Sequence, residues 1–412
     1  GLFSELTLRM ALQNFEESRI SRHLNDPIQE NRLERVSAYS TNLDFRKTIG
    51  NKSTLFYGLE WVLDQVNSTG LEKDILTGVS SLGPSRYPQA DWQSYAAYFS
   101  FQHQWNKYLM TQAGLRYNGI RLKAQFDTNF YPLPFEKADL NTQAVTGGFG
   151  IVYQPSSTWN LRTNLATAFR APNVDDIGKV FDSEPGSVVV PNPYLKPEYA
   201  ISWDMGFAHM INKRIKIDFS GYLTNLTNAM TRRDFSLNGA TEIIYDGAPS
   251  SVQAIQNAAQ AQVYGIHTGL EVKLLSGFGI TSDLNWQKGT EEMDDGTTSP
   301  ARHTAPWFGA TRLSFKTQNL FIQGYTQYSG GFTHNQLAIE ERSKTEIYAL
   351  DGNGKTYAPA WHTFNLKAQY DLANNFKLIA GIENITDQRY RTYSSGISAA
   401  GRNLILAIRA QI

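Results

Sequence analysis

The chain repeats one pattern from end to end: segments of alternating apolar and polar residues, separated by breaks that are short and long in turn. Alternation with a period of two places apolar side chains on one face of a strand and polar side chains on the other. Tight turns at one end and long loops at the other are typical of strands that cross a membrane repeatedly. The pattern therefore predicts an all-β fold, a transmembrane antiparallel up-and-down β-barrel.

Sixteen segments fit such strands. They begin near Phe3, Arg32, Ser53, Trp92, Leu109, Gln143, Thr158, Glu198, Arg214, Gln262, Phe278, Pro306, Leu320, Trp361, Phe376 and Arg402. Seven short breaks interleave with eight long ones, and the long ones cover residues 21–31, 66–91, 123–141, 171–197, 232–261, 289–305, 331–360 and 389–401. A soluble β-sandwich has no reason to obey this rule, and a β-propeller would repeat a motif every 40–50 residues or so.

The segment at 214–224 indicates which face meets lipid. Arg214, Lys216 and Asp218 share one face, and Ile217 lies on the other. A basic side chain facing lipid at mid-bilayer costs roughly 2–4 kcal/mol. We therefore expect the apolar face to look outward and the polar face to line the interior. A shift of one residue would carry the same cost, so the register is well specified.

Composition excludes several other classes of protein. Hydrophobic residues make up 41% of the chain, but the longest apolar runs, such as 404–408, are far shorter than the roughly 20 residues of a transmembrane helix. The 38 basic and 38 acidic residues balance, so no nucleic-acid partner is expected. The sequence holds no catalytic constellation and is not expected to be an enzyme. Because no linker divides it, residues 1–412 are expected to be one outer-membrane β-barrel domain.

Two short boxes flank the break at 171–197. The first is F-R-A-P-N at 169–173, and the second is P-N-P-Y-L-K-P-E at 191–198. Pro172 ends strand pairing, because proline cannot donate a ladder hydrogen bond. The residues before Pro193 and Pro197 are restricted to extended or turn geometry. On these physical grounds alone, the boxes are rigid loop edges.

The two boxes also resemble the F-R-A-P-N and N-P-x-L-K-P-E motifs of TonB-dependent outer-membrane transporters. The stretch 383–390 is similar to that family's closing E-N-L-T-D-x-x-Y block, and a G-R pair opens the last strand. The resemblance covers essentially the whole chain, and the stretch 180–186 looks most like versions from Bacteroidota. The residues that match the family motifs are Phe169, Arg170, Ala171, Pro172, Asn192, Pro193, Leu195, Asn384, Asp387, Gly401 and Arg402.

The resemblance implies a 22-stranded barrel whose lumen is closed by an N-terminal plug. These sixteen strands would be its last sixteen, with the plug and first strands upstream of Gly1. The implied partners are outer-membrane lipid and the TonB–ExbB–ExbD complex, acting through the plug, with a surface lipoprotein as a further candidate. The family usually ends in an aromatic residue, where this chain has Ile412.

The family resemblance also implies a cargo. An iron complex is expected, a siderophore before haem, with cobalamin, oligosaccharide or peptide less favoured, and no cofactor of the protein's own. Four residues are candidate ligand contacts: Phe130, Tyr131, Phe135 and His334. Aromatic side chains in a barrel mouth can hold a ligand by stacking, or they can simply pack the loops together. His334 is included because haem receptors of the family often carry a His between the two boxes, where this chain has none. No histidine has the spacing of a metal site, so none is expected.

Two rival functions belong to different classes of protein. Sixteen strands could close by themselves as a passive porin, or the barrel could anchor a surface-binding protein without uptake. The basic residues on interior faces, Arg162, Arg170, Arg214 and Lys216, either attract an anionic chelate or bond to a plug, and the second interpretation is favoured.

Overall fold

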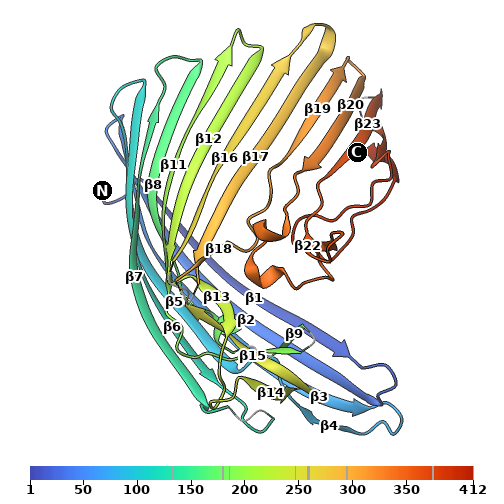
Figure 1. The fold of residues 1–412 in the computed structure, drawn as a ribbon. Coiled ribbons are helices and arrows are strands. Elements are labelled where there is room, and N and C mark those ends of the chain that lie inside the picture. Colours follow the sequence, from blue (N-terminus) through green and yellow to red (C-terminus); the bar gives the residue numbers. More distant parts are fainter. Residues whose placement is uncertain are drawn as a thin grey trace.

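The computed structural model describes residues 1–130, 133–178, 181–184, 186–245, 247–257, 260–293, 296–373 and 375–411. One curved antiparallel sheet dominates it (Figure 1). Its sixteen long strands are β1 (Glu5–Ser21), β2 (Ile28–Ile49), β3 (Ser53–Asp74), β5 (Gln89–Gln104), β6 (Leu109–Gln125), β7 (Lys137–Tyr153), β8 (Trp159–Arg170), β11 (Glu198–Ile211), β12 (Ile215–Thr227), β16 (Gln260–Lys273), β17 (Phe278–Glu292), β19 (Phe308–Lys316), β20 (Leu320–Ser329), β23 (Trp361–Ala373), β24 (Phe376–Glu383) and β25 (Asn403–Ala410). The short strands β4 (Ser80–Gly83) and β18 (Thr298–Pro300) bring the total to 18. The sixteen-strand, all-β prediction is confirmed.

Each long strand pairs with the long strand before it and the one after it, as an up-and-down sheet requires. The two outermost strands differ. Among the described residues, β1 pairs only with β2 and β25 pairs only with β24. The sheet is therefore open between β1 and β25, unlike the closed cylinder that a sixteen-stranded porin would form.

The two faces of the sheet have the predicted character. Leu165 on β8 lies opposite Trp203 on β11, and both side chains are about half exposed on the outer face. One residue along, Asn164 donates a hydrogen bond to Asp204 on the inner face, with 3.2 Å between Nδ2 and Oδ1. Polar side chains on the inner face thus find partners on neighbouring strands, while the outer face offers mainly apolar contact.

Inner-face charges are also paired across strands. Arg9 on β1 forms an ion pair with Asp44 on β2, which accepts a hydrogen bond from the Tyr98 hydroxyl of β5 at 2.6 Å. Further along the sheet, Arg116 of β6 pairs with Glu60 of β3. These charged side chains compensate one another across strands, as expected for a surface that lines an interior.

Four of the long breaks were placed wrongly, because strands continue into them. One of these strands is β17, which runs to Glu292 and so into the break predicted at 289–305. β1 extends to Ser21 and β2 begins at Ile28, so the break predicted at 21–31 is a connection of residues 22–27. Likewise β3 reaches Asp74, β6 reaches Gln125, and β7 begins at Lys137. Beyond the bilayer both faces of a strand are wet, so the alternation disappears while the ladder hydrogen bonds continue.

The long loops carry their own secondary structure. Loop four, residues 171–197, contains helix α1 (Val174–Gly178), β9 (Phe181–Glu184) and β10 (Ser187–Val190). Loop five, residues 228–259, contains β13 (Met230–Asp234), β14 (Glu242–Tyr245) and β15 (Ala248–Asn257). Strand β10 pairs in parallel with β15, so loops four and five share one small sheet.

The loop between β20 and β23 contains η2 (His334–Gln336), η3 (Ile339–Glu341), β21 (Ala349–Leu350) and β22 (Thr356–Tyr357). A further 3₁₀ turn, η1 (Leu275–Gly277), joins β16 to β17. Within the described ranges, no helix is both long and apolar enough to span a bilayer.

Candidate ligand-binding site at the barrel mouth

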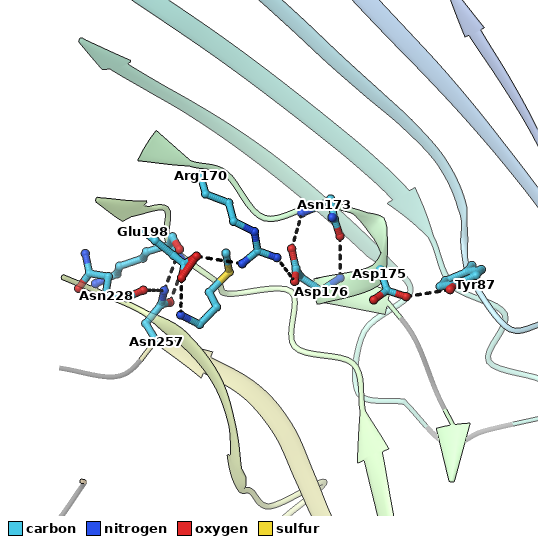
Figure 2. Close-up of polar contacts among 10 residues, drawn as sticks. Tyr87, Arg170, Asn173, Asp175, Asp176, Glu198, Asn228 and Asn257 are labelled. Carbon is cyan, nitrogen blue, oxygen red and sulfur yellow. Dashed lines mark hydrogen bonds and ion pairs between the residues drawn. The ribbon is translucent and has the colours of Figure 1, made fainter. Parts of the chain in front are cut away.

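The two boxes around loop four are joined by the side chain of Arg170 (Figure 2). Its guanidinium lies 3.0 Å from Glu198 Oε1 and 2.6 Å from Asp176 Oδ1. Partial burial lowers the pKa of Arg170, but the two carboxylates outweigh burial and hold that pKa above its usual value. Arg170 is thus a permanently charged link between the end of β8, the start of β11 and helix α1.

Helix α1 begins with a reciprocal cap. The Asn173 N–H donates to Asp176 Oδ2 and the Asp176 N–H donates to Asn173 Oδ1, both at 2.9 Å. Such an exchange satisfies two backbone donors that a helix start leaves open. Pro172, which has no N–H, precedes the cap without creating another unsatisfied donor.

A tyrosine from a distant loop also holds α1. The Tyr87 hydroxyl donates to Asp175 Oδ1 at 2.7 Å, across 88 positions of sequence (Figure 2). Burial and this hydrogen bond both raise the pKa of Tyr87, so its hydroxyl remains a donor at any physiological pH.

Packing places α1 against the inner face of the large sheet. Ile177 and Leu122 are fully buried and belong to one apolar cluster, which we call the mouth core. Its members are Ala90, Leu122, Ala124, Phe126, Ala138, Val174, Ile177 and Leu195. Leu122 and Ala124 lie on the same face of β6 as Arg116, the face that looks inward. Loop four therefore folds into the mouth of the barrel.

The second box connects loop four to loop five. Asn192 donates to the Ile255 carbonyl at 2.8 Å, next to the turn that contains Pro193. Asn257 donates to the Asn228 carbonyl at 2.8 Å (Figure 2). It also accepts from the Lys196 N–H and donates to the Lys196 carbonyl, both at 2.8 Å. The hydrogen bond to Ile255 explains why an amide side chain, that of Asn192, occupies the second box.

The closing block near the C-terminus is a separate structural unit. Asn384 donates to the carbonyls of Gln388 and Ala400, and Asp387 accepts from the Arg402 N–H at 2.8 Å. A Cβ on Gly401 would lie 2.6 Å from Asp387 Oδ1, so a larger residue fits there only if that carboxylate moves. The structure brings these four motif residues together, away from loop four.

The proposed ligand contacts fall in three different settings. Phe130 is exposed in the loop between β6 and β7, and Tyr131 lies outside the described residues. Phe135 packs edge-to-face on Phe126 at 5.1 Å and against the mouth core, as the loop-packing interpretation expects. His334, in the loop between β20 and β23, has its Nδ1 3.1 Å from Thr356 Oγ1. Within the described chain, no group of three or more His, Asp or Glu is arranged to hold a metal ion.

A cavity of about 590 Å³ lies between α1 and strands β1, β2, β3 and β5. We call it the lumen pocket. Its walls include Glu34, Asp64, Tyr87, Trp92 and Val174. Sequence reasoning missed Glu34, Asp64 and Trp92 as site residues. Alternation places them on inner faces, but no local signal shows that loop four folds over them.

The sequence matches the family model "TonB dependent receptor-like, beta-barrel" over residues 6–385. It is 24% identical over 338 residues to the hemoglobin-haptoglobin utilization protein B of Neisseria meningitidis serogroup A / serotype 4A, covering 76% of this chain and 40% of that protein. It is also 24% identical over 292 residues to the hemoglobin-binding protein A of Haemophilus influenzae, covering 64% of this chain and 26% of the relative.

Among solved structures, the fold resembles the copper transporter OprC with a TM-score of 0.80 and 14% identity, over 99% of this chain and 63% of that one. It also resembles a double mutant of the Serratia marcescens hemophore receptor HasR, in complex with its hemophore HasA and heme. That match has a TM-score of 0.69 and 14% identity, over 98% of this chain and 66% of HasR. The chain thus spans less than half the length of these curated relatives and about two thirds of these structures.

Proposed function

We propose, from the premise that this chain belongs to the TonB dependent receptor-like β-barrel family, that it forms the barrel of a transporter for an iron complex. The protein is located in the bacterial outer membrane. Cargo enters from outside through the loops, and TonB supplies the energy for its passage. The barrel contributes a rigid wall and the loops that meet the cargo first.

The observation that carries this proposal is the inward fold of loop four. Arg170, Asp176 and Glu198 hold α1 against the inner face of β6, so a loop narrows the mouth instead of leaving an open channel. A passive porin needs a closed ring of strands, whereas β1 and β25 are unpaired on one side among the described residues.

The proposal also covers the other strands, the plug and the partners with which the barrel would act. Residues 1–412 would be one barrel domain that supplies the last sixteen of 22 strands. A plug would transmit the pull of TonB, which works with ExbB and ExbD. Lipid would surround the apolar outer face, and a surface lipoprotein is a candidate partner. The likeness to Bacteroidota sequences stays a prediction.

A siderophore is our first candidate cargo. Haem is the second, supported by the names of the Neisseria and Haemophilus relatives, which refer to hemoglobin. The motif residues Phe169, Ala171, Pro172 and Pro193 would then shape loop four, and Phe130, Tyr131, Phe135 and His334 remain candidate ligand contacts. Cobalamin, oligosaccharide and peptide are less favoured cargoes.

The test is growth of a deletion strain under iron limitation, supplied in turn with defined siderophores, haem or ferric salts. We expect one iron source to support the wild type and not the deletion strain, and its use to require TonB. Equal growth of both strains on every iron source would overturn the iron proposal. Growth that depends on the protein but not on TonB would favour a passive channel.

A further inference from the structure

We propose that the lumen pocket binds an organic cation, an alkyl chain with an ammonium group at each end, between Glu34 and Asp64. The inference deepens the proposed function and rests on it in one respect, that the cation belongs to the cargo. Binding itself can be measured without uptake, so the failure of one proposal is distinguishable from the failure of the other.

The first observation is an unpartnered carboxylate oxygen. Glu34 is only 6% exposed, and its Oε1 accepts a hydrogen bond from the Ser68 hydroxyl at 3.3 Å. Its Oε2 is buried and has no hydrogen-bond partner in the described chain. Buried polar atoms are nearly always satisfied, and an ionised oxygen most of all. A cationic donor in the pocket would supply the missing partner.

The second observation is the placement of Asp64. Strands β2 and β3 pair Glu34 with Ser68, Val36 with Val66, and Ala38 with Asp64. All six side chains of these pairs share the inner face, so the two carboxylates lie on either side of the Val36–Val66 pair. Asp64 has no hydrogen-bond or ion-pair partner among the described residues.

The spacing decides the class of ligand. Glu34 lies opposite Ser68, which is four residues from Asp64 on β3. The backbones at Glu34 and Asp64 are therefore about 13 Å apart along the strands, at the rise of a strand. Two carboxylates so far apart cannot share one metal ion, whose ligand oxygens lie within about 2.6 Å of it. An alkyl chain with an ammonium group at each end fits better, because the chain can lie on the valines while each head group meets one carboxylate.

The walls of the pocket suit a cation with an apolar stem. Trp92 contributes an aromatic surface, which attracts a cation held over its face. Val36 and Val66 supply apolar surface between the two carboxylates. Of the described residues that line the pocket, none is Lys or Arg. A ligand therefore has to bring the positive charge.

Two further carboxylates in the wall already have basic partners. Glu16 is paired with Arg35 at 2.8 Å, and Glu17 is paired with Arg19 at 2.7 Å. The fifth carboxylate of the wall, Asp175, accepts the hydrogen bond from the Tyr87 hydroxyl at 2.7 Å. Glu34 and Asp64 are therefore the carboxylates of the pocket that a cationic ligand would neutralise.

The experiment is a calorimetric titration of the complete detergent-purified protein with cadaverine (1,5-diaminopentane), and with 1,5-pentanediol as the uncharged probe of equal length. We expect saturable binding of cadaverine and none of the diol. Glu34→Gln and Asp64→Asn should each weaken cadaverine binding at least about tenfold, because each removes a charge and keeps the side-chain shape. Glu242→Gln, which alters an exposed carboxylate on β14, should leave binding unchanged.

Three outcomes would overturn the proposal: no saturable binding of cadaverine, equal binding of the diol, or unchanged affinity in both pocket variants. Gel mobility before and after heating reports whether each variant is folded, and Glu242→Gln must behave as the wild type in that assay. If cadaverine binds as expected while growth on every iron source is unaffected by deletion, the cation-binding proposal is supported and the iron proposal fails. If growth on an iron source depends on the protein but cadaverine does not bind, the iron proposal is supported and the cation-binding proposal fails.

Discussion

Arg170 and Glu198 face each other as the last residue of β8 and the first residue of β11, and their side chains meet at 3.0 Å. The same guanidinium also holds Asp176, so one residue fixes both the strand ends and the helix between them. The two boxes around loop four thus have a structural explanation that does not require contact with cargo.

Replacing Arg170 with Gln should release α1. Hydrogen bonds to charged groups contribute roughly 1.5–3 kcal/mol each when shielded, and less here because Arg170 is about half exposed. We expect faster amide exchange in residues 173–178 and little change in the barrel strands. Arg121→Gln, which breaks an exposed pair with Asp139 at 3.3 Å, is the matched control and should change neither. Equal exchange in the wild type and Arg170→Gln would contradict the linking role.

Replacing Ile177 with Ala should have a similar effect through packing. Ile177 is fully buried in the mouth core, and truncation of a buried Ile costs about 2–5 kcal/mol. Because the mouth core joins loop four to β6, the loss should appear as protease cleavage in loop four while the barrel stays intact on a gel. Ile244→Ala, at an exposed site on β14, serves as the control and should not increase cleavage.

The outer and inner faces of β8 should respond oppositely to a new charge. Leu165→Arg places a cation toward lipid near the middle of the strand and should cost about 2–4 kcal/mol. Asn164→Arg places it on the inner face beside Asp204 and should be tolerated. The measurement is the yield of folded protein in lipid vesicles. A larger loss for Asn164→Arg would mean that the faces have been assigned the wrong way round.

Gly401→Ala should destabilise the closing block and do so through Asp387. The added Cβ would sit 2.6 Å from Asp387 Oδ1, and such overpacking costs about 1–3 kcal/mol. Asp387→Ala removes the clash together with the hydrogen bond to the Arg402 N–H. We therefore expect the double variant to be more stable than the sum of the single effects, measured as midpoints of thermal unfolding. Simple additivity would refute the contact.

The loops near Glu291 should be more stable in mild acid. Burial and the neighbouring Glu340 raise the pKa of Glu291 to about 6 from an ordinary value near 4.5. A carboxyl whose folded pKa is raised stabilises the fold below its unfolded pKa, and this contribution is lost as the pH rises through about 6. Burial alone would raise the pKa of Glu341, but hydrogen bonds from Tyr348 and Ser394 hold that pKa below its ordinary value. Glu341 therefore stabilises the fold above its unfolded pKa, and this contribution is lost as the pH falls below 4.5 or so.

We therefore expect local amide exchange around residue 291 to be slower at pH 5 than at pH 7, after correction for intrinsic rates. Glu291→Gln should remove that difference, because its amide does not titrate. A pH dependence that survives the substitution would assign the effect to other groups.

The sequence was sufficient for the strands but not for the site. Alternation in segments such as 214–224 carries the face and register of a strand, because a slip would expose charges to lipid. Alternation does not predict the hydrogen bond between Tyr87 and Asp175, or the burial of Ile177 in one cluster with Leu122, because both depend on how a long loop folds. The boxes were visible as motifs, yet the contact between their first and last charged residues depends on two strands lying side by side.

In the part of the chain that the structure describes, β1 and β25 are each open on one side, which has a practical consequence for handling the protein. Each presents a row of backbone N–H and C=O groups, and hydrocarbon offers them no substitute for water. Strands in this arrangement cannot insert into a bilayer until those groups are matched by other strands. Refolding trials on the sixteen strands alone should accordingly yield edge-to-edge aggregates, and only added neighbouring strands should give a heat-resistant band.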